Sequence, residues 1–243
     1  MKILLLAGTS EARALAKLLA EHGQDVLASL AGVTRAPATY PVPTRVGGFG
    51  GEAAQRDFVI TKGFDAVVDA THPFAAQISA RSNKICNILS VPYLRVLRSE
   101  WRAETEDDWH LIDRPEAATA HIPHGARVLL ATGAVSVSDW AELANGRTLF
   151  CRRVDATDDP FPYEGGWIVA RPPFSLEEEL DTLRTYQITH LVSKNAGGPT
   201  SAKLLAARQL GLPVVMLNRP ELPDCDRVET PQEALEWLTR LNR

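Results

Sequence analysis

The stretch Lys2-Ile3-Leu4-Leu5-Leu6-Ala7-Gly8-Thr9-Ser10-Glu11 opens the chain and decides its fold class. The unbroken apolar run over residues 2–7 predicts a strand buried on both faces, as strands of helix-covered parallel sheets are. Gly8 predicts a tight turn, and residues 10–22 then carry apolar side chains at helical spacing. A strand, a glycine turn and a helix in this order are typical of a doubly wound α/β domain.

Short apolar runs and helical patterns alternate along most of the chain. The expected strands are residues 2–7, 25–31, 44–46, 66–70, 91–97, 127–131, 147–152, 167–171, 190–193 and 213–217. The expected helices are residues 10–22, 52–62, 73–87, 136–143, 175–186, 200–210 and 231–241. Alternating units of this kind form parallel sheets with right-handed crossovers.

The alternation breaks at residues 99–110, which are charged and aromatic and show no strand or helix period. We therefore place a domain hinge at residues 97–101. The sequence predicts two small Rossmann-like, doubly wound parallel-sheet domains, residues 1–97 and residues 98–243, with a cleft between them. The nucleotide turn lies in the first domain, so the second is expected to serve the substrate.

Composition excludes several classes of protein. The 243 residues carry a net charge of −4 without a run of like charges, whereas nucleic-acid binding needs a clustered basic face. The three cysteines, Cys86, Cys151 and Cys225, lie far apart, which predicts no disulfide framework and no metal site and favours a reducing cytoplasm. No stretch approaches the roughly 20 apolar residues of a membrane helix, so no membrane contact is expected.

The turn Gly8-Thr9-Ser10 is the first candidate site. A glycine turn that leads into a helix offers free backbone N–H groups and a favourable dipole to a phosphate, and the hydroxyls of Thr9 and Ser10 add donors. The alternative is a plain turn in which Ser10 caps the helix.

Two further segments of the first half indicate which nucleotide is bound. The end of the second expected strand, residues 29–35, contains Arg35 and no acidic residue, which favours a 2′-phosphate and hence NADP over NAD. The loop Gly47-Gly48-Phe49-Gly50-Gly51 would let the backbone lie against a flat ligand, with Gly47 directly after a strand. A solvated arginine and a merely flexible loop are the alternatives.

Residues 69–75 follow the fourth expected strand at the same sheet edge as Gly8. Thr71 is expected to contact the cofactor there. His72 could donate a hydrogen bond to a ligand or move a proton near neutral pH. A purely structural histidine is the alternative.

The second half carries a matching set of polar residues where strands end. These are Thr132-Gly133, Arg152-Arg153, Lys194-Asn195-Ala196-Gly197-Gly198 and Arg219-Pro220, with Lys203 on the following helix. Such residues gather at strand ends when that edge binds a ligand. The acidic run at residues 177–179 is interpreted as a solvated helix start, and His121 with His124 lacks the further ligands of a metal site.

Taken in order, these residues resemble the precorrin-6A reductase family. The resemblance rests on residues 6–11, 69–75, Leu94-Arg95 with Trp101, Thr132-Gly133, residues 194–198 with Lys203, and residues 210–215 with Arg219-Pro220, and it spans residues 1 to 220. Two departures are visible, because Ala7 stands where the family usually has a second glycine and Ala196 where it has serine.

The resemblance implies an NADPH-dependent oxidoreductase that reduces one double bond of the precorrin-6A macrocycle, giving precorrin-6B in cobalamin biosynthesis. It also leaves room for transient contact with neighbouring pathway enzymes. The implied substrate bears many carboxylates, and the available cations are Arg95, Arg98, Arg152, Arg153, Lys194 and Lys203. A non-enzymatic NADP-binding regulator of the same fold is the main alternative, and a sugar-nucleotide transferase is another.

The expected site follows from both lines of reasoning. Cofactor contacts are assigned to Gly8, Thr9, Ser10, Arg35, Gly47, Thr71, Thr132 and Gly133. Substrate contacts are assigned to Arg95, Arg152, Lys194, Asn195 and Lys203. Catalytic roles are assigned to His72 and Lys203, and no metal is expected.

Overall fold

The computed structural model describes residues 1–32 and 39–241, which divide into two compact units. The first unit joins Met1–Ser99 to Pro220–Arg243, and the second unit is Glu100–Arg219. Within the described residues, no helix is long and apolar enough to cross a membrane.

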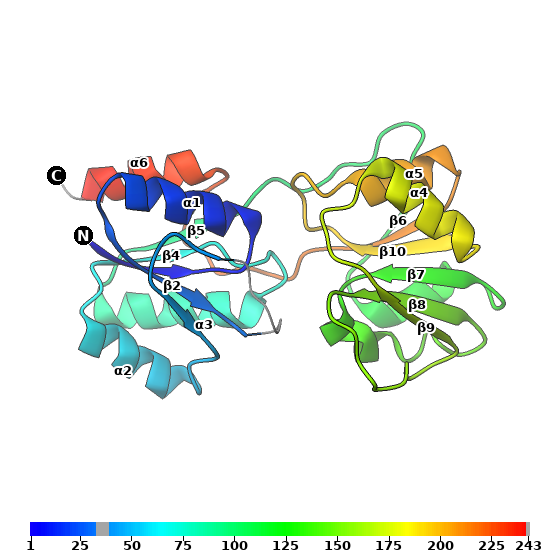
Figure 1. Ribbon diagram of the computed structural model, residues 1–243. Coiled ribbons are helices and arrows are strands. Elements are labelled where there is room, and N and C mark those ends of the chain that lie inside the picture. Colours follow the sequence, from blue (N-terminus) through cyan, green and yellow to red (C-terminus); the bar gives the residue numbers. More distant parts are fainter. Residues whose placement is uncertain (33–38, 242–243) are drawn as a thin grey trace. The chain divides into compact units, whose positions relative to one another are not determined.

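The first unit is a six-stranded parallel sheet in the order β12-β5-β4-β1-β2-β3. Its strands are β1 Lys2–Leu6, β2 Asp25–Leu30, β3 Thr44–Val46, β4 Ala66–Asp69, β5 Tyr93–Val96 and β12 Asp226–Val228. Its helices are α1 Ser10–Glu21, α2 Glu52–Lys62, α3 Ala76–Leu89 and α6 Pro231–Leu241. Figure 1 shows α1 and α6 over one face of this sheet and α2 and α3 over the other.

The apolar opening run forms the central strand because both of its faces are covered. Ile3 and Leu5 pack into the core beneath α1 and α6, while Leu4 and Leu6 pack into the core beneath α2 and α3. All four side chains are almost wholly buried. This confirms the expected strand buried on both faces.

The second unit is also a six-stranded parallel sheet, in the order β6-β11-β10-β7-β8-β9. Its strands are β6 Trp109–Ile112, β7 Arg127–Ala131, β8 Thr148–Arg153, β9 Gly165–Val169, β10 His190–Lys194 and β11 Val214–Leu217. Its α-helices are α4 Leu176–Thr185 and α5 Ala202–Gln209, and two 3₁₀ segments, η1 Pro115–Ala120 and η2 Ala134–Trp140, complete the unit. The expected fold class, two Rossmann-like parallel-sheet domains, is confirmed.

The helix expected at residues 136–143 is instead the 3₁₀ segment η2. Ser136 has non-helical dihedral angles within that segment, and its hydroxyl donates to the carbonyl oxygens of Thr132 and Gly133. A serine that bonds the preceding turn competes with α-helical hydrogen bonding, which accounts for the difference.

One edge strand of each sheet lies outside the main series of alternating strands and helices in its unit. After β5 the chain enters the second unit and supplies β6, which pairs with β11. After β11 it returns and supplies β12, which pairs with β5. Neither edge strand was predicted from the sequence, because a strand of three or four residues has too few positions to show a period in its hydrophobicity.

The end assigned to the second domain, residue 243, is therefore wrong. Residues 220–243 belong to the first unit, where the apolar stripe of α6 packs against α1. The helix itself is where the sequence placed it, with its cap at Thr230. Which sheet it covers is a tertiary property that its own periodicity does not encode.

Candidate active site

Residues expected to bind a ligand gather in the first unit where the strand order reverses, between β1 and β4. Ligands of open α/β sheets bind beyond the carboxyl ends of the strands at such a point. The Thr9 hydroxyl donates to the carbonyl oxygen of Ala70 at 2.7 Å, which ties the two strand exits together. A small pocket opens beside them, lined by Thr9, Glu11, Thr71, Pro73, Val96 and Arg98.

The turn after β1 has the geometry of a phosphate site, although its hydroxyls are used differently than expected. Gly8 has a φ of +133°, and the position of a Cβ there is open space. Thr9, rather than Ser10, caps α1 by accepting from the Ala12 N–H at 3.1 Å. Ser10 is exposed and donates to Glu11 at 3.0 Å. Backbone N–H groups and helix dipole, more than Thr9, therefore suit this turn to a diphosphate.

The glycine loop after β3 is similarly open. Gly47 has a φ of +118° and donates its N–H to the Leu30 carbonyl at 2.9 Å, which holds the loop at the end of β2. A Cβ would meet no atom within 4 Å at Gly47 or at Gly48. Arg35 lies outside the described residues. Arg45 on β3, which the sequence analysis did not single out, reaches this loop and donates to the Gly48 carbonyl at 3.0 Å.

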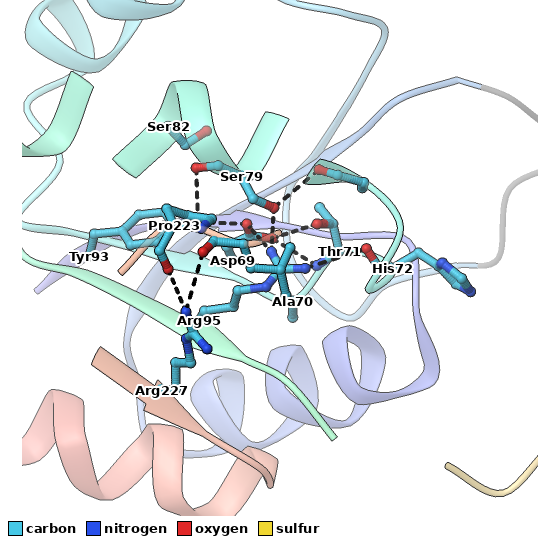
Figure 2. Close-up of polar contacts among 12 residues, drawn as sticks. Asp69, Ala70, Thr71, His72, Ser79, Ser82, Tyr93, Arg95, Pro223 and Arg227 are labelled. Carbon is cyan, nitrogen blue, oxygen red and sulfur yellow. Dashed lines mark hydrogen bonds and ion pairs between the residues drawn. The ribbon is translucent and has the colours of Figure 1, made fainter. Parts of the chain in front are cut away.

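A buried polar network holds the loop after β4 (Figure 2). The Asp69 carboxylate, fully buried at the end of β4, accepts from the Thr71 N–H at 2.9 Å and from the Thr71 hydroxyl at 2.6 Å. Tyr93 donates to the same carboxylate at 2.6 Å, and burial together with that carboxylate raises the pKa of Tyr93, so the phenol stays protonated. The Thr71 side chain thus secures the loop, and its predicted contact with the cofactor remains a proposal.

Arg95 is part of this network and is committed to partners within the protein, so its expected contact with substrate carboxylates stays a prediction. Its side chain is fully buried, and its guanidinium donates to Asp69 at 2.5 Å and to the hydroxyl of Ser79. A second nitrogen reaches the His72 carbonyl at 3.4 Å. A buried arginine paired in this way cannot leave its carboxylate without stranding a charge.

His72 occupies the exposed end of the same loop. Its imidazole points away from the Asp69 network in Figure 2, and its Nδ1 accepts from the Phe74 N–H at 3.2 Å. In the neutral ring this bond leaves the proton on Nε2, which is then a donor. The arrangement suits the hydrogen-bonding or proton-transfer role that the sequence predicts.

Glu11 and Arg98 form an ion pair beside the pocket. The Arg98 guanidinium donates to the Glu11 carboxylate at 2.8 Å, and both side chains are about one-sixth exposed. Burial acts to raise the pKa of Glu11, but its own backbone N–H and Arg98 outweigh burial and lower it. Arg98, expected among the cations for substrate, thus also neutralises an acid at the start of α1.

The second unit has the equivalent strand reversal between β7 and β10. Thr132 and Gly133 follow β7, and Lys194 ends β10. Lys194 donates from Nζ to the Ser136 hydroxyl at 3.2 Å, and Ser136 in turn donates to the Thr132 carbonyl at 3.0 Å. Burial lowers the pKa of Lys194, while Asp139 acts in the opposite direction. The structure thus brings together residues that the sequence analysis divided between cofactor and substrate.

Arg152 is engaged within the protein, and its expected contact with the substrate stays a prediction. Its guanidinium forms a two-pronged ion pair with Glu179, at 2.8 and 2.6 Å, and packs over the ring of Phe174. Glu179 is buried, so the interpretation of residues 177–179 as a solvated helix start is wrong at Glu179. The pair forms because the acidic first turn of α4 faces the end of β8.

Asn195 is likewise committed to the fold. Its amide oxygen accepts from the Trp101 N–H at 2.9 Å, and its amide nitrogen donates to the Trp101 carbonyl at 3.2 Å. This pair of bonds fixes the segment that precedes β6. Asn195 is buried, so the structure does not support its assignment to a substrate carboxylate.

Lys203 lies in the first turn of α5, as expected, although the helix begins at Ala202 rather than at residue 200. Its ammonium donates to the Thr200 carbonyl at 2.9 Å and lies 4.5 Å from the centre of the Trp101 ring. The indole therefore helps to place this cation by a cation–π contact. Its role toward a ligand remains a prediction.

The described residues contain no group of three or more histidine, cysteine or acidic side chains that could hold a metal ion.

Comparison with known proteins identifies the family. The family model described as precorrin-6x reductase CbiJ/CobK matches residues 2–239. The chain belongs to this family. It is 41% identical over 240 residues to the precorrin-6A reductase of Rhodobacter capsulatus, covering 98% of this chain and 95% of that protein. It is 38% identical to the precorrin-6A reductase of Rhodococcus erythropolis, covering 100% and 99%.

A solved structure titled CobK precorrin-6A reductase superposes with a TM-score of 0.94 at 40% identity, covering 99% of this chain and 97% of that one. Membership of the precorrin-6x reductase family makes the chain an oxidoreductase. Ligands of open α/β sheets bind at strand reversals, so we expect the reductant and the molecule that is reduced to bind at these two places.

Proposed function

We propose that this reductase transfers a hydride from NADPH to one double bond of precorrin-6A and so produces precorrin-6B in cobalamin biosynthesis. The observation that carries the proposal is the match to a reductase family over residues 2–239. It favours a reductase over the two alternatives, a non-enzymatic regulator and a sugar-nucleotide transferase, because it covers both units and not the nucleotide turn alone.

The first unit is the proposed nucleotide side. The open space at Gly8 and the amino end of α1 fit a diphosphate, and the open backbone at Gly47 fits the rest of a dinucleotide. Bound NADPH would supply the hydride. Thr71 lines the small pocket beside Thr9, and Ser10 is exposed in the turn after β1. Both therefore remain candidates for contact with the cofactor.

The second unit is the proposed substrate side. Lys194 and Lys203 are its candidate cations for the carboxylates of a precorrin. Thr132 and Gly133, which the sequence assigns to the cofactor, are linked to Lys194 through Ser136. The conjugated macrocycle can absorb the electron pair of the hydride, so the protein needs no strong acid. A single proton must accompany the hydride, and His72 and Lys203 are the proposed groups for moving it.

The test is an anaerobic assay of the purified protein with precorrin-6A and either NADPH or NADH. We expect loss of the reduced-nicotinamide absorbance with NADPH and a product heavier by two hydrogen atoms. No consumption of either cofactor would overturn the proposed reaction. Equal rates with both cofactors would overturn the NADPH preference and leave the reduction standing.

A further inference from the structure

Arg45 is a partly buried cation at the nucleotide edge of the first sheet. It lies on β3, paired in register with Ser29 on β2, and both residues stand close to the carboxyl ends of their strands. Burial lowers the pKa of Arg45, and no acidic group of the described residues acts on that pKa in the opposite direction. Arg98, at the same sheet edge, is by contrast neutralised by Glu11.

The guanidinium of Arg45 is held in one orientation by uncharged partners. One terminal nitrogen donates to the Ser29 hydroxyl at 2.7 Å and the other to the Gly48 carbonyl at 3.0 Å. The Phe49 ring covers one face of the guanidinium at 4.2 Å from its centre, and Phe58 lies 5.4 Å away. These contacts use two of the five N–H donors of an arginine.

We propose that Arg45 binds the 2′-phosphate of NADPH and is thereby a determinant of the preference for NADPH over NADH. The inference rests on the proposed use of NADPH by this reductase. The ribose of a dinucleotide lies at the end of the second strand of such sheets, where an acidic residue selects NAD and an arginine accommodates the extra phosphate. Arg45 reaches this place from the neighbouring strand.

Partial removal of a cation from water costs free energy when no anion faces it, and a phosphate dianion would supply that partner. The bonds to Ser29 and Gly48 and the stacking on Phe49 pre-orient the guanidinium, so little side-chain freedom is lost on binding. Arg35, the residue that the sequence favours for this phosphate, lies outside the described residues and is the competing candidate.

The experiment measures binding of NADPH, NADH, 2′,5′-ADP and 5′-AMP by calorimetry to the wild type and to Arg45→Gln. Loss of one charge-assisted contact should weaken NADPH and 2′,5′-ADP about 10- to 100-fold. NADH and 5′-AMP, which lack the 2′-phosphate, should change less than about twofold. Arg56→Gln is the matched control, because it removes the same charge from an exposed arginine of α2 and should change none of the four affinities.

Two further variants keep the inference open to refutation if Arg45→Gln folds poorly. Arg45→Lys keeps the charge without the planar fork and should give an intermediate, phosphate-selective loss. Ser29→Ala removes the acceptor that orients the guanidinium and should give a smaller loss with the same selectivity.

Equal weakening of all four ligands, or no weakening, would overturn the role of Arg45. A selective loss seen only in Arg35→Gln would also overturn it and assign the phosphate to Arg35. A wild type that binds NADPH and NADH equally, yet reduces precorrin-6A, would refute this inference while the reductase function stands.

Discussion

Gly8 combines a left-handed φ of +133° with open space at its Cβ position. Gly8→Ala should therefore cost about 1 kcal/mol of stability through backbone strain and should also block the approach of a diphosphate. Gly8→Val would carry the same backbone strain and would add bulkier side-chain atoms, although the open space alone would tolerate them. We expect calorimetry to show loss of NADPH binding in a folded Gly8→Ala variant.

The matched control is Gly23→Ala, because Gly23 also has a positive φ, of +66°, and also has open space around it, but lies at the opposite end of α1. This variant should lose similar stability and bind NADPH normally. Normal NADPH binding by Gly8→Ala would place the phosphate site elsewhere.

The two candidate substrate lysines, Lys203 and Lys194, allow a second prediction at the residue scale. If both bind precorrin carboxylates, Lys203→Ala and Lys194→Ala should each lower kcat/KM for precorrin-6A by a factor worth about 1–3 kcal/mol and leave NADPH affinity nearly unchanged. The two variants should differ in the free energy of unfolding. Lys203→Ala removes a cation–π contact with Trp101, whereas Lys194→Ala removes a cation that is half-buried. Steady-state kinetics would contradict the assignment by showing weakened NADPH binding with normal precorrin kinetics.

At the scale of elements, β4 and β5 are joined by a fully buried ion pair between Asp69 and Arg95. Asp69→Ala strands the guanidinium in the interior and should cost about 3–5 kcal/mol in the free energy of unfolding. Replacing both residues by apolar ones should cost much less than Asp69→Ala, since no charge is left unpaired. Denaturant titration measures both.

The exposed pair Lys84–Glu52, which joins α3 to α2 at 2.8 Å, is the control for that experiment. Glu52→Ala should change stability by less than about 1 kcal/mol because both side chains are solvated. An Asp69→Ala variant no less stable than Glu52→Ala would show that the network does not hold β4 and β5 together.

The amino end of β10 makes the second unit sensitive to acid. Burial lowers the pKa of His190 below its ordinary value of 6.5, His110 and Arg147 act in the same direction, and Asp108 opposes them. The unfolded chain therefore binds a proton at a higher pH than the folded chain does. The contribution of His190 to the free energy of unfolding is fully present above pH 6.5. It falls as the pH drops from 6.5 toward the lower pKa that His190 has in the folded chain.

His190→Gln should flatten this decline, as followed by the free energy of unfolding against pH. His22→Gln, at an exposed histidine of the first unit, should leave the decline unchanged. A decline that is identical in the wild type and in His190→Gln would assign it to other groups.

At the scale of the whole molecule, the first unit needs both ends of the chain. α6 buries Ala234, Trp237 and Leu238 in the same core as α1, and Trp237 donates to Asp226 of β12 at 2.9 Å. A fragment of residues 1–99 should therefore stay largely unfolded, whereas residues 1–99 joined by a flexible linker to residues 220–243 should fold. Residues 100–219 should fold alone, because their sheet is complete within one segment.

Circular dichroism and the dispersion of NMR amide signals would report these outcomes. A cooperative thermal transition in residues 1–99 alone would show that β12 and α6 are dispensable. Failure of the linked fragment to fold would show that the first unit depends on the second.

Much of the fold was predictable from the sequence because its signals are local. The opening run, the glycine turn and the helical stripe of α1 are each visible within a dozen residues, and β3 and α2 have the predicted bounds. The cap of α4 at Ser175 is likewise visible in the sequence, since a serine three residues before a glutamate is typical of a capping box.

The sequence by itself determined the α/β class, the alternation of elements, and the strand ends at which polar residues collect, because periodicity and turn chemistry are written over short spans. Only the tertiary structure decided which of these polar side chains are available to a ligand. Arg95, Arg152 and Asn195 lie at or near the carboxyl ends of strands, as Lys194 does, yet the first two pair with buried carboxylates and the third binds the backbone of Trp101. Those partners lie 26, 27 and 94 residues away along the chain, and pairing over such separations follows from packing rather than from any local pattern.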